Sequence, residues 1–281
     1  MTIRRLPDLT PGQVEQLQDA LLENADTLLN SAIAVLELGH VSLARSLAIL
    51  GLEESGKAIA IHERRVALEY APDGELFRCE ELDKLWASHE KKLEAVHNFL
   101  LEEPYWFDTE APDYEENSRY LGTIKSWSRR HDRSKQRGFY VDLSKTGQIM
   151  APTDMKDESA LREVLAHVHQ IGWQLRLGEH IEGKRQDERA AGVPAASEED
   201  LALSDILPRL MNEHPALYRS IRDSLGAGIP GEVLPNAAYR FNPPNKNQEA
   251  FRNLAKRGHD AETREVLRLA QELSQSTDEH E

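Results

Sequence analysis

The spacing of apolar residues predicts a long first helix from Pro11 to Leu38. Thr10 is a suitable N-cap ahead of Pro11, and Gly39 is a suitable stop after the last apolar position. The apolar positions alternate at intervals of three and four, which places them on one face of a helix: Val14, Leu17, Leu21, Ala25, Leu28, Ala32 and Val35.

The following segment, from Gly39 to Tyr70, predicts a helix that is apolar on both sides. One side carries Leu43, Leu47 and Leu50, and the other carries Leu52 and Ile59. A helix that is apolar all round is normally buried in the centre of a bundle. The same segment nevertheless contains "EESGK", at positions 53–57, although buried charges are costly unless they are paired.

The rest of the chain adds further helices and one region of strand character. In "RGFYVDLSKTGQIMAP", two β-prone runs flank residues 145–147, which predicts a small hairpin with Tyr140 and Asp142 on one strand face. The fold expected is therefore an all-α bundle with one short β-hairpin and a helical C-terminal extension. The domain limits expected are 1–185 for the bundle, 186–200 for a linker and 201–281 for the extension. The further helices are predicted at about 80–101, 118–134, 157–182 and 198–225, with a closing pair after 247.

Composition narrows the class of protein. The net charge is −15 and the chain has one cysteine, so a disulfide framework and a cysteine-based metal cluster are both excluded. No apolar run has the length of a membrane span, and the first residues lack an apolar signal core. We expect a protein of the bacterial cytoplasm that makes no contact with a membrane and uses no cofactor or metal.

The charges of "EESGK" admit two interpretations. Glu53 and Lys57 are one helical turn apart, and Glu54 and Lys57 are three residues apart, so either carboxylate can pair with the ammonium. The first interpretation is a structural ion pair that fixes helix packing. The second is a polar cluster facing a cleft, in which Lys57 stabilises phosphate charge and His89 and Lys92 converge from the next helix.

A local reversal of charge follows between Arg119 and Lys145. Eight basic residues stand there against Asp132 and Asp142, and Trp127, Phe139 and Tyr140 lie among them. Such a stretch is typical of a surface that binds RNA, in which aromatic rings stack on bases. The alternative is a solvated face that docks an acidic segment of a partner. The candidate RNA-binding residues are Arg129, Arg130, Arg133, Arg137 and Tyr140.

Three motifs in this order resemble the AbiV-type abortive-infection proteins of the HEPN superfamily: "LARSLAILGLEESGKA", "WASHEKKL" and "RGFYVDL". The resemblance covers about residues 15–180. It implies a HEPN helical bundle, a homodimer, and a superfamily in which many members are metal-independent ribonucleases. Several of those ribonuclease lineages carry a Glu-x-x-x-Lys element, which Glu53 and Lys57 match. Glu54 and Asp142 are expected to be structural polar residues.

The resemblance also implies a search for an Arg-x(4 to 6)-His pair, in which histidine takes the 2′-hydroxyl proton and arginine neutralises the phosphate. The best candidate is Arg162 with His169, which share one face of a helix, and His167 is the alternative base. Arg209 with His214 and Arg252 with His259 have the same spacing, and Arg162 is preferred because its segment lies in the expected bundle.

The sequence therefore supports two alternative hypotheses for the function. The first is an antiphage effector that cuts RNA, and the second is a non-catalytic HEPN module that binds RNA or a phage or host protein. A phage-encoded or host protein is the expected trigger. A ferritin-like metal bundle is set aside, because only Glu94 and His97 have the Glu-x-x-His spacing that it requires.

Overall fold

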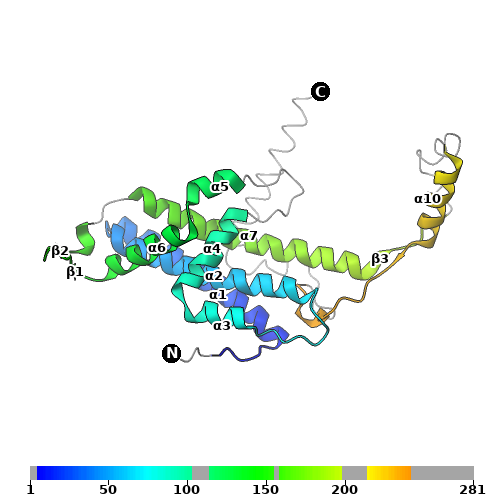
Figure 1. The fold of residues 1–281 in the computed structure, drawn as a ribbon, viewed down its shortest axis with the longest axis horizontal. Helices are drawn as coiled ribbons and strands as arrows, with labels where there is room; N and C mark the ends of the chain where they lie inside the picture. Colours follow the sequence, from blue (N-terminus) through cyan, green and yellow to red (C-terminus); the bar gives the residue numbers. More distant parts are fainter. Residues whose placement is uncertain (1–4, 103–113, 155–157, 198–213, 242–281) are drawn as a thin grey trace, which may run out of the picture.

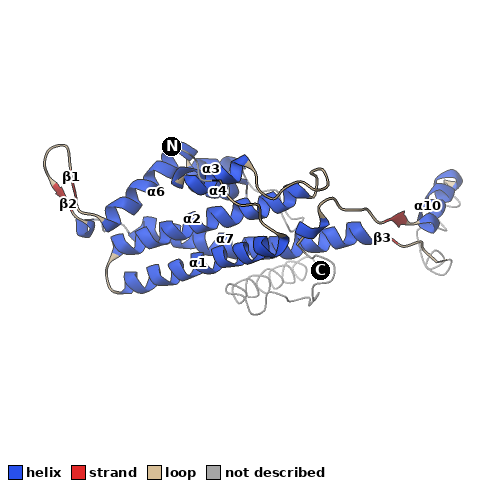
Figure 2. Ribbon diagram, turned by 90° about the horizontal axis from the view of Figure 1, so that it is seen from below, coloured by secondary structure: helices blue, strands red, loops and turns tan. Residues whose placement is uncertain are grey.

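The structure is a computed structural model that describes residues 5–102, 114–154, 158–197 and 214–241. Its centre is a bundle in which one helix, α2, contacts all the other long helices (Figure 1). The helices run beside one another along the long axis of the bundle (Figure 2). The bundle consists of α1 (Pro11–Glu37), α2 (Val41–Leu68), α4 (His89–Glu102), α6 (Ile124–Phe139) and α7 (Glu158–Ala191). The prediction of an all-α bundle with a small hairpin is confirmed.

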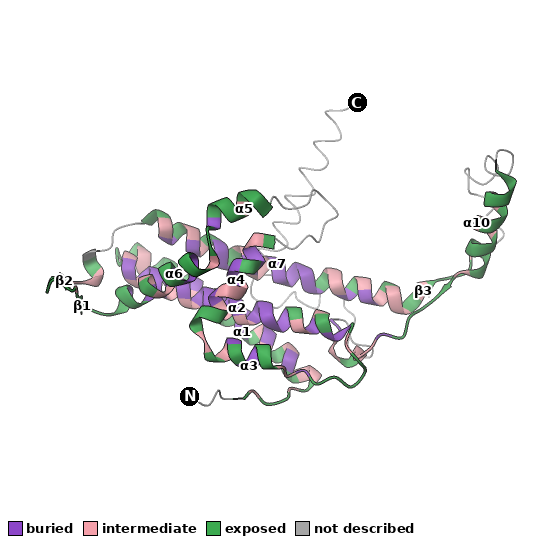
Figure 3. Cartoon of the chain, in the orientation of Figure 1, coloured by how far each residue is buried: buried purple, intermediate pink, exposed green. Residues whose placement is uncertain are grey.

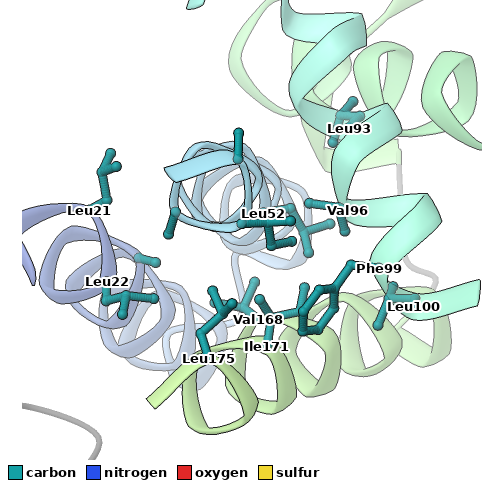
Figure 4. Packing of buried hydrophobic residues seen from close by; sticks show 14 of the residues in the cluster. Leu21, Leu22, Leu52, Leu93, Val96, Phe99, Leu100, Val168, Ile171 and Leu175 are labelled. Atoms are coloured by element: carbon teal, nitrogen blue, oxygen red, sulfur yellow. The ribbon is translucent and has the colours of Figure 1, made fainter. Parts of the chain in front are cut away.

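The central helix α2 is buried along most of its length, as its two-sided apolar pattern predicts (Figure 3). Leu52 is completely buried and lies between Val96 of α4 and Val168 and Ile171 of α7 (Figure 4). The side that carries Leu43, Leu47 and Leu50 is only half-buried. The deeper side is formed by Ala44, Ala48, Ile49, Leu52 and Ile59.

Two predicted helices are each divided in two, so those predictions were wrong in extent. The first is divided into α3 (Glu80–Ala87) and α4 at Ser88, whose φ of −130° and ψ of 123° are extended. The Ser88 hydroxyl accepts a hydrogen bond from the Lys91 amide at 3.2 Å and so caps α4. The second is divided into α5 (Tyr114–Leu121) and α6 at Gly122, whose φ is +74°.

The predicted hairpin is present but shorter than expected. Strand β1 (Asp142–Leu143) pairs antiparallel with β2 (Ile149–Met150), and Gly147 occupies the turn with a φ of +79°. Residues 137–139 belong to α6, and Tyr140 follows the end of that helix. The expectation that Tyr140 and Asp142 share a strand face was therefore wrong, because the helix continues through the first half of the motif. A short 3-10 helix, η1 (Pro152–Asp154), follows the hairpin.

Helix α7 continues to Ala191, nine residues beyond the predicted end at 182. Strand β3 (Gly192–Val193) then pairs with β4 (Ile229–Pro230), and α10 (Pro215–Ala227) lies between these strands. Helix α10 covers only the second part of the helix predicted at 198–225. Residues 198–213 and the predicted closing helices lie outside the described residues. None of the described helices is long and apolar enough to cross a membrane.

After β4 the chain returns to the bundle as a segment that we call the C-terminal strap, residues 232–241, which contains η2 (Ala237–Tyr239). The Asn236 amide donates to the carbonyl oxygens of Leu68 and Pro72, both at 3.0 Å, at the end of α2. Arg65 of α2 donates to the Tyr239 and Arg240 carbonyl oxygens. The strap therefore satisfies carbonyl groups that the end of a helix leaves without intrahelical partners.

The last described residue of the strap, Phe241, is almost fully buried. Its ring lies 3.9 Å from the guanidinium carbon of Arg65 and 4.9 Å from the His62 ring centroid. The Tyr239 hydroxyl donates to the Leu9 carbonyl oxygen at 2.8 Å. The strap thus joins the N-terminal segment and α2.

Candidate functional site

Glu53 lies in the middle of α2 with a side chain only 5% exposed, and its two carboxylate oxygens have different partners. Oε2 lies 2.6 Å from Nδ1 of His89, the first residue of α4. Oε1 accepts a hydrogen bond from the Lys135 ammonium of α6. Three helices therefore meet at one carboxylate, and its charge is balanced within the bundle.

Two glycines bring these helices close enough for such contacts. A Cβ atom at Gly56 of α2 would overlap the Lys92 carbonyl group of α4. A Cβ atom at Gly138 of α6 would overlap the Ser42 carbonyl group and the Ser46 hydroxyl of α2. Each glycine belongs to one of the motifs singled out in the sequence, "EESGK" and "RGFYVDL". Their role is close backbone approach, which no residue with a side chain permits there.

Glu54 and Lys57 form a separate ion pair on the same helix. The Lys57 ammonium lies 2.6 Å from Glu54 Oε1, and it lies 5.7 Å from the ring centroid of Trp86 in α3. Both charged side chains are partly exposed. The interpretation of this spacing as an ion pair is confirmed for Glu54, whereas Glu53 pairs with groups from other helices.

Lys92 of α4 adds a further ammonium group near Glu53, besides that of Lys135. The side chain is half-buried, and burial lowers the pKa of its ammonium because desolvation disfavours the charged form. The carboxylates of Glu53 and Glu54 act in the opposite direction, whereas Lys57 and Lys135 lower the pKa further. His89 and Lys92 thus converge on Glu53, as the sequence suggested, and we call Glu53, His89, Lys92 and Lys135 the polar cluster.

The opposite side of α6 presents the four candidate arginines to solvent. Arg130 has Glu163 of α7 at 4.0 Å. Arg129, Arg133 and Arg137 have no carboxylate within ion-pair distance among the residues that the structure describes. Helical spacing places all four within about a third of the circumference of α6. We call these four residues the arginine face.

The residues that follow the arginine face are also exposed. Tyr140 is 68% exposed and Phe139 is 39% exposed. Asp142 accepts a hydrogen bond from the Leu143 amide at 2.7 Å, within its own strand. No described contact joins Asp142 to the polar cluster. The tip of the hairpin carries Lys145 in an exposed position.

The candidate pair of α7 has a different setting. Arg162 and His169 are both exposed on one side of the helix, and Arg162 lies 3.7 Å from Glu158. His167 faces the interior instead, where burial, helped by the nearby Arg130, lowers its pKa to about 4. Within one chain, therefore, the structure brings Arg162 and His169 to the same surface and separates His167 from them.

Sequence reasoning did not single out Lys135 as a site residue. Its signal is the spacing along α6, where Trp127, His131 and Lys135 recur at intervals of four and Gly138 follows three residues later. These four residues are all buried and define the face of α6 that is turned toward the bundle, where Lys135 and Gly138 contact α2. A lysine on that face needs a buried anion, and Glu53 of α2 is that anion.

Comparison with known proteins supports the resemblance found in the motifs. The model of the protein family described as AbiV matches residues 13–173, more than half of the chain. The matched range extends from α1 into α7 and includes the whole polar cluster, but not the C-terminal strap. No curated protein and no solved structure matches the chain significantly. Among the described residues, no three His, Cys, Asp or Glu side chains are grouped to hold a metal ion.

Proposed function

Since the chain belongs to the AbiV family of HEPN proteins, we propose that it is an abortive-infection effector that binds RNA and cuts it without a metal ion. The observation that carries this proposal is the arginine face. Three guanidinium groups without carboxylate partners among the described residues stand on one helix of a chain whose net charge is −15. Such a local concentration of positive charge binds phosphate groups and releases their counterions.

The aromatic residues beside the arginine face favour single-stranded RNA over other polyanions. Phe139 at the end of α6 and Tyr140 directly after it are exposed, at the side of the molecule where the hairpin projects (Figure 1). Exposed aromatic rings next to a basic surface stack on unpaired bases. The arginines would hold the backbone, and the rings would hold the bases.

The effector would act in the bacterial cytoplasm as a homodimer released by a phage-encoded or host protein. In this dimer Arg162 and His169, which are exposed on one side of α7, would be available to a cleft shared with the second copy. The competing function is a HEPN module that binds RNA or a protein without cutting RNA. Cleavage distinguishes the two functions.

RNA binding is tested with the purified full-length protein and a fluorescent single-stranded RNA, by anisotropy over a range of salt concentrations. The triple variant Arg129→Glu/Arg133→Glu/Arg137→Glu should bind much more weakly and with a flatter salt dependence, because fewer counterions are released. A matched control, Lys84→Glu/Lys184→Glu/Arg219→Glu, reverses three exposed charges elsewhere. Equal loss in both variants would mean a general effect of net charge and would contradict the arginine face as the RNA-binding surface.

Cleavage is followed with the same RNA in the presence of EDTA, with analysis of the products. The proposal expects activity that survives chelation and leaves a 2′,3′-cyclic phosphate. Binding without cleavage, in the presence and absence of infected-cell extract, would favour the non-catalytic function. Cleavage that is lost with EDTA would contradict the metal-independent reaction.

A further inference from the structure

We propose that the polar cluster is the reaction centre for RNA cleavage, with His89 as the general base and Glu53 as the residue that positions it. The inference rests on the proposed function, and it places the chemistry on α2, α4 and α6 rather than on the arginine–histidine pair of α7. It starts from the single contact that joins an exposed imidazole to a buried carboxylate. His89 has a side chain that is 63% exposed, whereas the Glu53 side chain is 5% exposed.

This contact fixes the tautomer of the imidazole. His89 Nδ1 lies 2.6 Å from Glu53 Oε2 and 3.4 Å from the Lys135 ammonium, which can only donate. The contact with the carboxylate is much the shorter of the two, and an ionised carboxylate can only accept, so we assign Nδ1 as the donor to Glu53. The other ring nitrogen, Nε2, then carries the lone pair in the neutral imidazole. A carboxylate that orients an imidazole through Nδ1 leaves Nε2 ready to take a proton, which is the arrangement required of a general base.

The surroundings keep Glu53 in place. Its other oxygen accepts from the Lys135 ammonium, which also lies 3.5 Å from Asp132. Glu53 is therefore held from two sides and cannot follow His89 into solvent. The geometry of the pair is set by the packing of α4 and α6 on α2, which depends on the two close approaches at Gly56 and Gly138.

The polar cluster also supplies cations for a phosphodiester. The Lys135 ammonium contacts Glu53 directly, Lys92 is near enough for the Glu53 carboxylate to raise its pKa, and Lys57 is one helical turn from Glu53 on α2. Positive charge placed where an oxyanion develops stabilises the transition state. Lys92 follows His89 by three residues on α4, so the two side chains project from the same side of that helix. Burial also lowers the pKa of the Lys92 ammonium, which therefore releases a proton more readily than an exposed lysine does.

The reaction that these groups support is transesterification of RNA. His89 Nε2 takes the proton of the 2′-hydroxyl, and the 2′-oxygen forms a bond to the adjacent phosphorus. The bond from phosphorus to the 5′-oxygen breaks, and that oxygen takes a proton from the Lys92 ammonium. The products are a 2′,3′-cyclic phosphate and a 5′-hydroxyl. Two proton transfers to and from solvent return the enzyme to its starting state.

The position of the polar cluster on α6 fits a substrate held by the arginine face. Lys135 lies at the same height along α6 as Arg133 and Arg137 but on the opposite, buried side of the helix, so an RNA chain that reaches both the arginine face and the polar cluster must pass around α6. The same helix would therefore hold the backbone with one side and contribute a cation to the reaction with another.

An ion pair that serves packing alone would have no need of His89. The buried Glu53 already has the Lys135 ammonium as a partner, and the imidazole is mostly in solvent. The imidazole is thus a second partner for a carboxylate that already has one inside the bundle, and helix packing alone does not account for it. Because His89 is mostly exposed and Glu53 keeps Lys135 as a partner, substitution of His89 tests its role in cleavage and leaves the core intact.

The test compares His89→Ala with His169→Ala and with a matched control, His40→Ala, which removes another exposed histidine. For each purified full-length variant we would measure single-turnover cleavage of a fluorescent RNA, RNA binding by anisotropy, and the melting temperature. His89→Ala should reduce cleavage by about 100-fold or more, the range typical of a general base. Its RNA binding and melting temperature should match those of His40→Ala.

Glu53→Gln tests the positioning role by separating the single-turnover rate at saturating RNA from the RNA affinity. Loss of the carboxylate leaves the imidazole without a fixed tautomer and orientation, so the maximal rate should fall while the affinity stays that of the wild-type protein. A residue that serves structure alone would lower the amount of folded protein without lowering the rate per folded molecule. If Glu53→Gln does not fold, Glu53→Asp keeps the charge for Lys135 but draws the carboxylate away from His89, and the maximal rate should again fall.

Cleavage that persists in His89→Ala would overturn the inference, and so would loss of cleavage in His169→Ala alone. Cleavage that persists in His89→Ala leaves the proposed function standing, whereas a wild-type protein that binds RNA through the arginine face but cuts none would overturn both the inference and the cleavage part of the proposed function. A protein that neither binds nor cuts RNA would overturn the proposed function itself. The two failures are therefore distinguishable.

Discussion

Gly138 of α6 lies directly against Ser42 of α2, so close that a side chain on the glycine would overlap the serine carbonyl oxygen. Gly138→Ala should therefore destabilise the protein by about 1–3 kcal/mol, because an added methyl group in a closely packed contact forces the two helices apart. The measurement is the free energy of unfolding from urea denaturation.

Gly172→Ala is the matched control, since a Cβ atom at Gly172 in α7 would meet nothing within 4 Å. This change should be neutral or should stabilise the protein by about 0.5–1 kcal/mol, because alanine loses less conformational freedom than glycine when a helix forms. Equal destabilisation by both changes would contradict the role given to Gly138.

Removal of Lys135 should destabilise the protein far more than removal of Lys57. Lys135→Met leaves the buried Glu53 carboxylate with the exposed His89 as its remaining partner, which costs about 3–5 kcal/mol. Lys57→Met breaks a partly exposed ion pair and should cost about 1 kcal/mol or less. Urea denaturation of both variants gives the comparison. The double variant Glu53→Gln/Lys135→Met should recover much of the loss, and no recovery would contradict the pairing.

Stability should fall as the pH falls from about 6.5 towards 4. Burial lowers the pKa of both His131 and His167 from 6.5 to about 4. The unfolded chain therefore binds more protons than the folded one in this range, so unfolding becomes more favourable as the pH falls. Each histidine contributes up to about 3 kcal/mol, which is fully present above pH 6.5.

The pH effect is measured as the free energy of unfolding between pH 7.5 and 4.5. His131→Gln and His167→Gln should each flatten the dependence, because glutamine does not titrate. His40→Gln, at an exposed position, should leave the slope unchanged. If the free energy of unfolding depends on pH with the same slope in the wild-type protein and in all three variants, groups other than these histidines cause the acid sensitivity.

The C-terminal strap should contribute a large part of the stability of the bundle. Phe241→Ala removes a buried ring that packs on Arg65 and His62, and it should cost about 3–5 kcal/mol. Val233→Ala, in the same strap, changes a side chain that is 95% exposed and should cost little. The contribution of the Phe241 ring is measured from the melting temperatures of the two variants. Similar values for both would mean that other contacts hold the strap on the bundle.

Helix positions follow from the sequence wherever apolar spacing is regular, and α1 and α2 were predicted to within a few residues. The breaks at Ser88 and Gly122 were missed because apolar spacing continues across them, and only the local caps reveal them. The extension of α7 beyond residue 182 was missed because its last turns are polar. Only one side of these turns is covered by the strap, through contacts such as that of the buried Gln186 with Phe241.

The candidate site was predictable in part. One of the two interpretations of "EESGK" was a polar cluster around Glu53 and Lys57 on which His89 and Lys92 converge from the next helix, and the contact of His89 with Glu53 agrees with it. The pairing of Glu53 with Lys135 was not predictable from local spacing, since the two residues are 82 positions apart. In the basic stretch, Lys135 is indistinguishable from its exposed neighbours until the buried face of α6 is identified.

The strap also determines when the folded protein can be completed during synthesis. The hydrogen bond from the Tyr239 hydroxyl to the Leu9 carbonyl oxygen joins residues that are 230 positions apart. All the bundle helices have left the ribosome before the strap exists, because the chain is made from its N-terminus. Closure of so distant a contact is slow compared with the formation of the helices themselves. The nascent chain therefore passes through a stage in which the helices have formed but the end of α2 is still open to water.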